Sequence, residues 1–136
     1  MRSPVRTLLP QQPFEEARQF FQQSRYRHVP IVTAEGVLVG VLSDRDVLRE
    51  AVRMAGTPEM WIQEIVPDVK TISEFMTKRV LTATPAAEIR QIAKAMFEER
   101  IGSMPIVNED RKLVGIITRS DILRTLVSHT PLELWI

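Results

Sequence analysis

The heptapeptide G-V-L-S-D-R-D at residues 40–46 returns as G-I-I-T-R-S-D at residues 115–121, 75 positions later. The similarity extends well beyond these heptapeptides. Aligned without a gap, residues 7–52 and 82–127 are identical at 13 of 46 positions. The chain is therefore an internal duplication. Because a unit this short cannot bury its own apolar face, we expect the two copies to pack together about a pseudo-twofold axis.

Each copy shows the same order of hydrophobic periodicities, which predicts a helix, two strands and a second helix. The first helix begins near Pro13 in copy one and is opened by Thr84-Pro85 in copy two. Its apolar positions are Phe14, Ala17, Phe20 and Phe21 in copy one, and Ile89, Ile92, Ala93, Met96 and Phe97 in copy two. The strands are expected at residues 29–33, 37–43, 104–108 and 113–118, and the second helices at residues 44–54 and 119–127.

A short strand is expected before each first helix, at residues 6–8 and 80–82, so that each copy reads β-α-β-β-α. The fold class is α/β (α+β), with the two sheets packed together and the helices outside. The predicted organisation is a first motif at residues 1–56, an inter-motif segment at 57–79, a second motif at 80–128 and an apolar tail at 129–136.

Two stretches outside the repeats carry enough apolar residues to pack on the body. Within the inter-motif segment, residues 59–66 and 72–76 are expected to form short helices. The tail is expected to dock on the domain or on a second subunit, since it ends in Leu132, Leu134, Trp135 and Ile136.

The composition excludes several classes of function. Eighteen basic and seventeen acidic side chains leave a net charge of +1 without a basic run, so neither nucleic acid nor membrane is an expected partner. The chain has no cysteine, and its two histidines, His28 and His129, lie in unrelated contexts, so we expect no metal site and no catalytic residues. The chain shows no signal-peptide pattern and no run of membrane-spanning length, which predicts a cytoplasmic protein.

The repeated residues resemble the cystathionine-β-synthase (CBS) domain. Both heptapeptides fit its Gly-φ-φ-Ser/Thr-x-x-Asp signature, Val29-Pro30 and Met104-Pro105 fit its strand entry, and Met76-Thr77 fits the usual opening of a second motif. The first copy lacks that Met-Thr opening. The resemblance implies a tandem CBS pair, or Bateman module, which is regulatory rather than enzymatic. Such modules commonly hold adenine nucleotides in two clefts and associate into disc-like homodimers.

The signature residues suit a nucleoside phosphate. A Ser or Thr at a strand-to-helix junction offers a hydroxyl beside unpaired N–H groups and the positive end of a helix dipole, which together favour a phosphate. An aspartate three residues later can accept hydrogen bonds from the two ribose hydroxyls. The strand entries offer walls and backbone groups for adenine. The candidate ligand-binding residues are Arg27, His28, Val29, Pro30, Ser43, Arg45, Asp46, Thr82, Gly102, Ser103, Met104, Pro105, Thr118, Arg119, Ser120 and Asp121.

The ligand expected from the resemblance is AMP, ADP or ATP, with S-adenosylmethionine or NAD(H) as further candidates, and the regulated protein partner is unknown. Because Asp44 adjoins Ser43 whereas Arg119 adjoins Thr118, we expect the second site to tolerate more phosphate charge. Arg27 or His28 can compensate in the first site, although His28 can equally be a partly exposed strand neighbour. The matched Arg49 and Arg124 either reach phosphates or are solvated charges on a helix face.

The alternative interpretation of the signature is structural. Ser/Thr-x-x-Asp before an apolar helix is also a capping box, in which both side chains bind helix N-terminal amides. The chain would then be a protein-interaction dimer without a small-molecule ligand. In either case we expect dimer contacts through the second helices, whose apolar residues are Val47, Leu48, Ala51, Ile122, Leu123 and Leu126.

Overall fold

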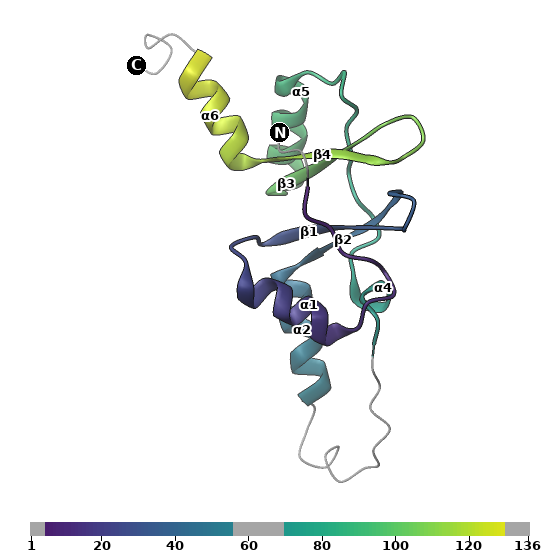
Figure 1. The fold of residues 1–136 in the computed structure, drawn as a ribbon. Coiled ribbons are helices and arrows are strands. Elements are labelled where there is room, and N and C mark those ends of the chain that lie inside the picture. Colours follow the sequence, from purple (N-terminus) through teal and green to yellow (C-terminus); the bar gives the residue numbers. More distant parts are fainter. Residues whose placement is uncertain (1–4, 56–69, 130–136) are drawn as a thin grey trace. The chain divides into compact units, whose positions relative to one another are not determined.

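The computed structural model describes residues 5–55 and 70–129, which fall into two compact units (Figure 1). The N-terminal unit comprises residues 6–80, and the C-terminal unit comprises residues 81–136 with residues 1–5. Each unit contains one two-stranded antiparallel sheet and its own hydrophobic core.

The N-terminal unit has the element order predicted for copy one. It comprises α1 (Phe14–Gln23), β1 (His28–Val32), β2 (Leu38–Ser43) and α2 (Asp44–Ala55), followed by the single turn α4 (Ile72–Phe75). The C-terminal unit repeats the first four elements. It comprises α5 (Ile89–Glu99), β3 (Ser103–Val107), β4 (Leu113–Thr118) and α6 (Arg119–His129).

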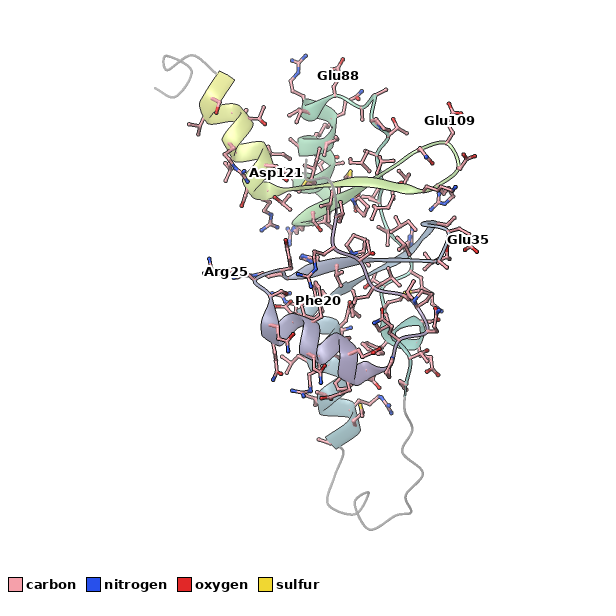
Figure 2. All side chains as sticks on the ribbon, viewed as in Figure 1. Phe20, Arg25, Glu35, Glu88, Glu109 and Asp121 are labelled. Carbon is pink, nitrogen blue, oxygen red and sulfur yellow. The ribbon has the colours of Figure 1, made fainter. Side chains whose placement is uncertain are left out.

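The two hairpins share one register, which is the clearest structural trace of the duplication. His28 pairs with Ser43 in the first hairpin, and Ser103 pairs with Thr118 at the same place in the second. Both registers shift at the fourth pair, between Ile31 and Val32 and at the equivalent step of β3. The turns match as well. Each contains one residue with positive φ, Gly36 at 88° and Arg111 at 62°, and each carries an exposed glutamate, Glu35 and Glu109 (Figure 2).

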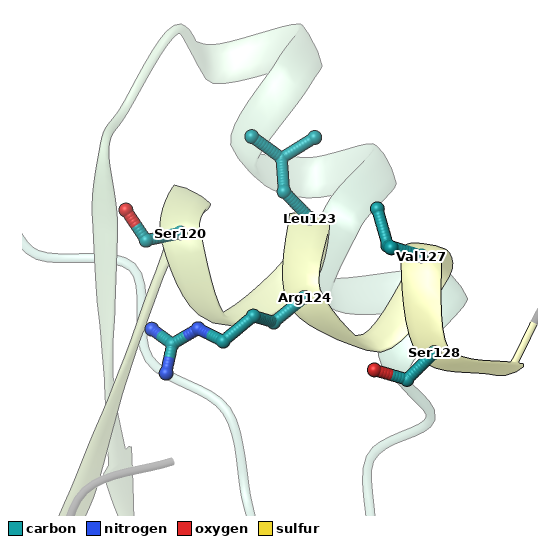
Figure 3. Close-up of a pocket in the computed structure, with 5 residues that line it drawn as sticks. All are labelled: Ser120, Leu123, Arg124, Val127 and Ser128. Atoms are coloured by element: carbon teal, nitrogen blue, oxygen red, sulfur yellow. The ribbon is translucent and has the colours of Figure 1, made fainter.

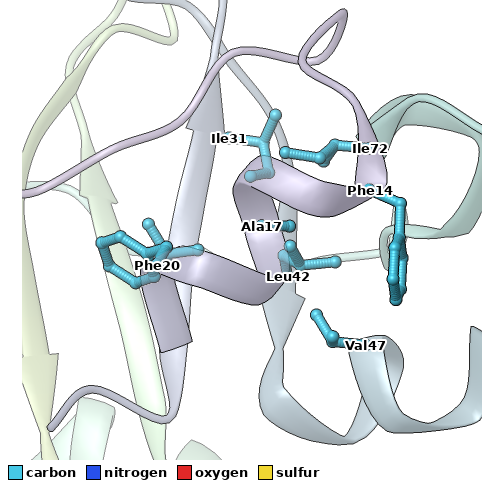
Figure 4. Close-up of a cluster of buried hydrophobic side chains, with 8 residues drawn as sticks. Phe14, Ala17, Phe20, Ile31, Leu42, Val47 and Ile72 are labelled. Carbon is cyan, nitrogen blue, oxygen red and sulfur yellow. The ribbon is translucent and has the colours of Figure 1, made fainter. Parts of the chain in front are cut away.

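The N-terminal core lies between the hairpin and its helices. Ala17, Ile31, Leu42 and Ile72 are completely buried, and Phe14 packs on Phe75 with ring centroids 5.7 Å apart (Figure 4). The C-terminal core is built from fewer large side chains and has no aromatic member. Its buried members are Ile92, Met96, Met104, Ile106, Ile117 and Ile122.

The expected leading strands are shorter than predicted. Each is a single parallel bridge, from Leu8 to Ile31 and from Ala83 to Ile106. Pro10 and Pro85 follow each bridge by two residues, and because proline has no N–H to donate, it ends the extended pairing.

The first helix of copy two also differs from the prediction. It begins at Ile89 rather than at Thr84-Pro85, because residues 84–87 form a turn closed by the Ala87 N–H and the Thr84 carbonyl (3.0 Å). Gln91 Oε1 then accepts the N–H of Glu88, the N-terminal cap. Phe97 was predicted on the buried face, but it is 84% exposed. Its angular offset from Ile92 and Met96 points it away from the hairpin.

The other predicted elements agree with the structure to within one or two residues, and Ile72–Phe75 confirms the second short helix of the inter-motif segment. The helix expected at residues 59–66 and the tail at residues 130–136 lie outside the described residues. The packing of the two sheets on each other and the four-part division of the chain stay predictions.

Candidate functional site

Ser43 and Asp46 bind each other reciprocally where β2 passes into α2. The Ser43 N–H donates to Asp46 Oδ2 (2.9 Å), and the Asp46 N–H donates to Ser43 Oγ (3.0 Å). This is the geometry of a capping box, and Asp46 is only 5% exposed. A third donor, Thr77 Oγ1, lies 3.4 Å from the same Oδ2.

Thr118 and Asp121 repeat this arrangement between β4 and α6. The Thr118 N–H donates to Asp121 Oδ2 (2.9 Å), the Thr118 hydroxyl lies 3.0 Å from the same oxygen, and the Asp121 N–H is 3.3 Å from Thr118 Oγ1. Asp121 is 8% exposed. Both copies therefore hold a buried carboxylate against a hydroxyl at a helix N-terminus.

Each carboxylate also accepts a hydrogen bond from the matched arginine one turn later. Arg49 Nη1 lies 3.1 Å from Asp46 Oδ1, and Arg124 Nη2 lies 3.1 Å from Asp121 Oδ1. The arginine side chains are 74% and 64% exposed. In this structure the two arginines thus bind the signature aspartates.

Asp121 is held in its ionised form. Burial raises the pKa of its carboxyl group, but the hydrogen bonds from the backbone and side chain of Thr118, with the nearby Arg124 guanidinium, outweigh burial and hold the pKa below 3.8. At neutral pH the group is therefore an acceptor, as partnership with ribose hydroxyls requires.

The strand entries lie beside these junctions. The Asp44 N–H donates to the Arg27 carbonyl (3.0 Å), and the Arg119 N–H donates to the Gly102 carbonyl (3.1 Å). Together with the strand registers, these bonds bring Arg27 and His28 next to Ser43, and bring Gly102 and Ser103 next to Thr118. Each hairpin therefore gathers two of the predicted segments at one end.

The apolar strand-entry residues face inward. Val29 and Met104 belong to the cores of their own units, and Pro30 and Pro105 are less than 2% exposed. Their backbone is thus better placed than their side chains to meet a ligand. Thr82 is half-buried and precedes Ala83, whose N–H donates to the Pro105 carbonyl (3.1 Å).

The remaining predicted residues lie at the surface. Arg27, Arg45, Arg119 and Ser120 are exposed, and His28, Gly102 and Ser103 are half-buried. An open hollow runs along α6, lined by Ser120, Leu123, Arg124, Val127 and Ser128, with Arg124 extending back toward Ser120 (Figure 3).

Two polar contacts near the first junction were not foreseen. The Thr77 hydroxyl reaches Asp46 from 31 residues away, a contact that no local spacing predicts. Glu50 is 5% exposed and accepts from Arg53 Nη2 (2.6 Å) and from Lys70 Nζ (3.5 Å). The Arg53 hydrogen bond lowers the pKa of the Glu50 carboxyl against the effect of burial. The Glu-x-x-Arg spacing was a signal for the Arg53 pair, but not for Lys70.

The described part of the chain holds no cluster of three or more metal-ligating side chains. Within residues 5–55 and 70–129, no helix is both long and apolar enough to cross a bilayer.

Similarity to known proteins follows the same two-copy pattern. AcuB from Vibrio cholerae, a protein proposed to act in acetoin utilization, is 30% identical and superposes with a TM-score of 0.79, covering 99% of this chain and 92% of that one. The CBS domain pair of the protein MJ0100, solved with 5′-methylthioadenosine and S-adenosyl-L-methionine, is 27% identical, with a TM-score of 0.75 and coverage of 94% and 92%.

A longer relative also contains the pattern. The protein MJ1225 of Methanocaldococcus jannaschii is 29% identical over 94% of this chain, which spans only 41% of that relative. The sequence model of the CBS domain matches residues 1–53 and 72–128, which correspond to the two structural repeats. The chain belongs to the CBS domain family and carries a tandem pair of these domains.

Proposed function

We propose that this CBS pair binds an adenine nucleotide or a related adenosyl compound, and that binding regulates a protein partner. The observation that carries the proposal is the duplicated junction, where a hydroxyl, a helix N-terminus and a buried aspartate recur with matching contacts. The 27% identical pair of MJ0100 binds two adenosyl compounds, which supports the same ligand class here.

The proposed roles follow from the chemistry of each group. Ser43 and Thr118 offer hydroxyls and helix N-terminal amides to a phosphate. Asp46 and Asp121 accept the ribose hydroxyls. Backbone groups of the strand entries, at Val29-Pro30 and Met104-Pro105, meet the adenine ring, while the exposed Arg27, Arg45 and Arg119 supply positive charge. The half-buried residues of the predicted site complete it: His28, Thr82, Gly102, Ser103 and, exposed, Ser120.

Ribose binding requires acceptor capacity on each aspartate. Oδ2 is occupied by the cap bonds, whereas the side-chain donor on Oδ1 is the guanidinium of Arg49 or Arg124. Because these arginines are largely exposed, they can swing away at small cost and leave Oδ1 to a ribose hydroxyl. The same movement would take the guanidinium toward a phosphate.

A second copy of the chain is the proposed structural partner. Leu48 and Val52 of α2 are 64% and 65% exposed, and their equivalents Leu123 and Val127 of α6 are 58% and 71% exposed. Matched apolar residues on both second helices suit a symmetric contact. Val47 and Ile122, expected on this surface, instead belong to the cores of their own units.

The reciprocal cap bonds favour a second candidate function. If Ser43–Asp46 and Thr118–Asp121 act only as capping boxes, the chain is an interaction module that dimerises without a small-molecule ligand. Both candidates are non-catalytic, and in both the identity of the regulated or bound protein is open to experiment.

Calorimetric titration separates the two. Protein stripped of ligand by unfolding and refolding is titrated with AMP, ADP, ATP, S-adenosylmethionine and NADH, beside Asp46→Asn and Asp121→Asn. Asparagine is a good cap acceptor and keeps the shape of aspartate, so each variant tests the charge while keeping the fold. Circular dichroism checks that fold.

The proposal predicts saturable binding of at least one adenosyl ligand that is weakened in one or both variants. Binding that both variants retain at full affinity would move the site away from the aspartates. Absence of heat with every ligand, from folded protein, would make the interaction module the better account.

A further inference from the structure

The two units differ in what covers the second helix. In the N-terminal unit, α4 lies against the core. Ile72 is completely buried, Phe75 packs on Phe14, and Lys70 lies 3.5 Å from Glu50 of α2. Among the described residues of the C-terminal unit, no segment plays this part for α6.

The positions that α4 covers have open equivalents in the C-terminal unit. Phe14 is buried, whereas its equivalent Ile89 is only half-buried. Ala51 packs against the N-terminal core, whereas its equivalent Leu126 is larger and 39% exposed. An apolar face of α5 and α6 is therefore left partly uncovered.

The polar position on this face has also changed. Glu50 holds the α4 segment through Lys70, but its equivalent is Thr125, whose hydroxyl donates to the Asp121 carbonyl of its own helix (3.0 Å). The C-terminal face therefore offers a neutral surface, which suits an apolar occupant rather than one anchored by a lysine.

The residues directly after α6 have the right composition and reach. Residues 130–136 read T-P-L-E-L-W-I, with four large apolar side chains in seven. Seven extended residues span about 23–25 Å. Leu126 lies three residues before the end of α6, roughly 5 Å along the helix axis. The tail is thus long enough to turn back and cover this face.

We propose that residues 130–136 dock on the inner face of α6, around Leu126 and Ile89, in the position that α4 occupies in the N-terminal unit. A second copy is a poorer occupant. The residues proposed for the dimer contact, such as Leu48 and Leu123, match between the repeats, whereas Ala51 and Leu126 differ. A face present in one unit alone calls for an occupant that follows that unit alone.

Tryptophan fluorescence tests this in the full chain. The protein has two tryptophans, so Trp61→Phe leaves Trp135 of the tail as the sole reporter. The docked tail predicts a blue-shifted emission and several-fold weaker acrylamide quenching than for a free tryptophan, both independent of protein concentration. Leu126→Asp should release Trp135 and remove the protection.

Two controls keep the test decisive. Val127→Asp changes the neighbouring, 71% exposed position and should leave Trp135 protected. Leu126→Ala is the milder variant if aspartate unfolds the unit, and it should raise quenching partway. Quenching like that of a free tryptophan in the Trp61→Phe protein would overturn the proposal. Protection that appears only on association, or that Val127→Asp abolishes, would also overturn it and assign the tail to a second copy.

Discussion

The N-terminal and C-terminal units share their hairpins and junctions but differ around the second helix. Strand register, turn conformation and the Ser/Thr–Asp–Arg contacts are repeated from one unit to the other. By contrast, the buried Glu50 is replaced by Thr125, and the buried Phe14 by the half-buried Ile89. The comparison separates two parts of the molecule. The repeated part carries the ligand proposal, and the unrepeated part sets how each unit completes its core.

The largest expected effect comes from removing the cover of the N-terminal unit. Ile72→Ala deletes a completely buried side chain and should lower the free energy of unfolding by about 2–5 kcal/mol, measured by urea denaturation. Leu123→Ala, on the 58% exposed position of α6, is the control and should stay within about 0.5 kcal/mol. Equal losses in the two variants would show that α4 is not part of the core.

A smaller loss is expected at the close approach of the same segment to β2. A Cβ on Gly40 would lie 2.6 Å from Met76 Sδ and 2.9 Å from the Thr77 carbonyl oxygen. That carbonyl accepts the Val41 N–H and cannot move freely, so Gly40→Ala should cost about 1–3 kcal/mol.

Gly36 provides the control for that substitution. It has a φ of 88° with nothing within 4 Å, so Gly36→Asn, which tolerates positive φ, should stay near wild-type stability. A Gly40→Ala protein as stable as the wild type would place residues 76–77 away from β2.

The matched caps should respond alike to loss of charge. Asp46→Asn and Asp121→Asn are each expected to cost about 1 kcal/mol or less at neutral pH. The folded pKa of Asp121 lies below the unfolded value of 3.8, so its ionisation stabilises the protein above that pH. This stabilisation is lost as the pH falls through the folded pKa.

Thermal unfolding against pH measures this contribution. The stability gap between wild type and Asp121→Asn should therefore close on acidification below about pH 4. A gap that widens there would mean that the folded carboxyl is the weaker acid.

The smallest effect is expected at Phe97, which is 84% exposed where the first copy has Gln22. Phe97→Gln should change the free energy of unfolding by no more than about 0.5 kcal/mol. A clear loss in urea denaturation would indicate that Phe97 is covered in solution.

The features that the sequence predicted well are those set by local pattern and repetition. Alternation, turns and the duplicated signature predicted the hairpins, the helices and the Ser43–Asp46 and Thr118–Asp121 pairs. Phe97 was misplaced because a helix face drawn too wide includes residues at its edge. The contacts of Thr77 and Lys70 depend on how a distant segment packs, and no spacing encodes that.

The central claim is that the repeated junctions bind an adenosyl ligand, and amide NMR spectra recorded during titration with AMP test it most directly. The account predicts saturable shifts concentrated at residues 43–46, at residues 118–121 or at both, with Asp46→Asn or Asp121→Asn weakening the response at the altered junction. An unchanged spectrum at millimolar AMP, or shifts confined to the hairpin turns around Glu35 and Glu109, would contradict it.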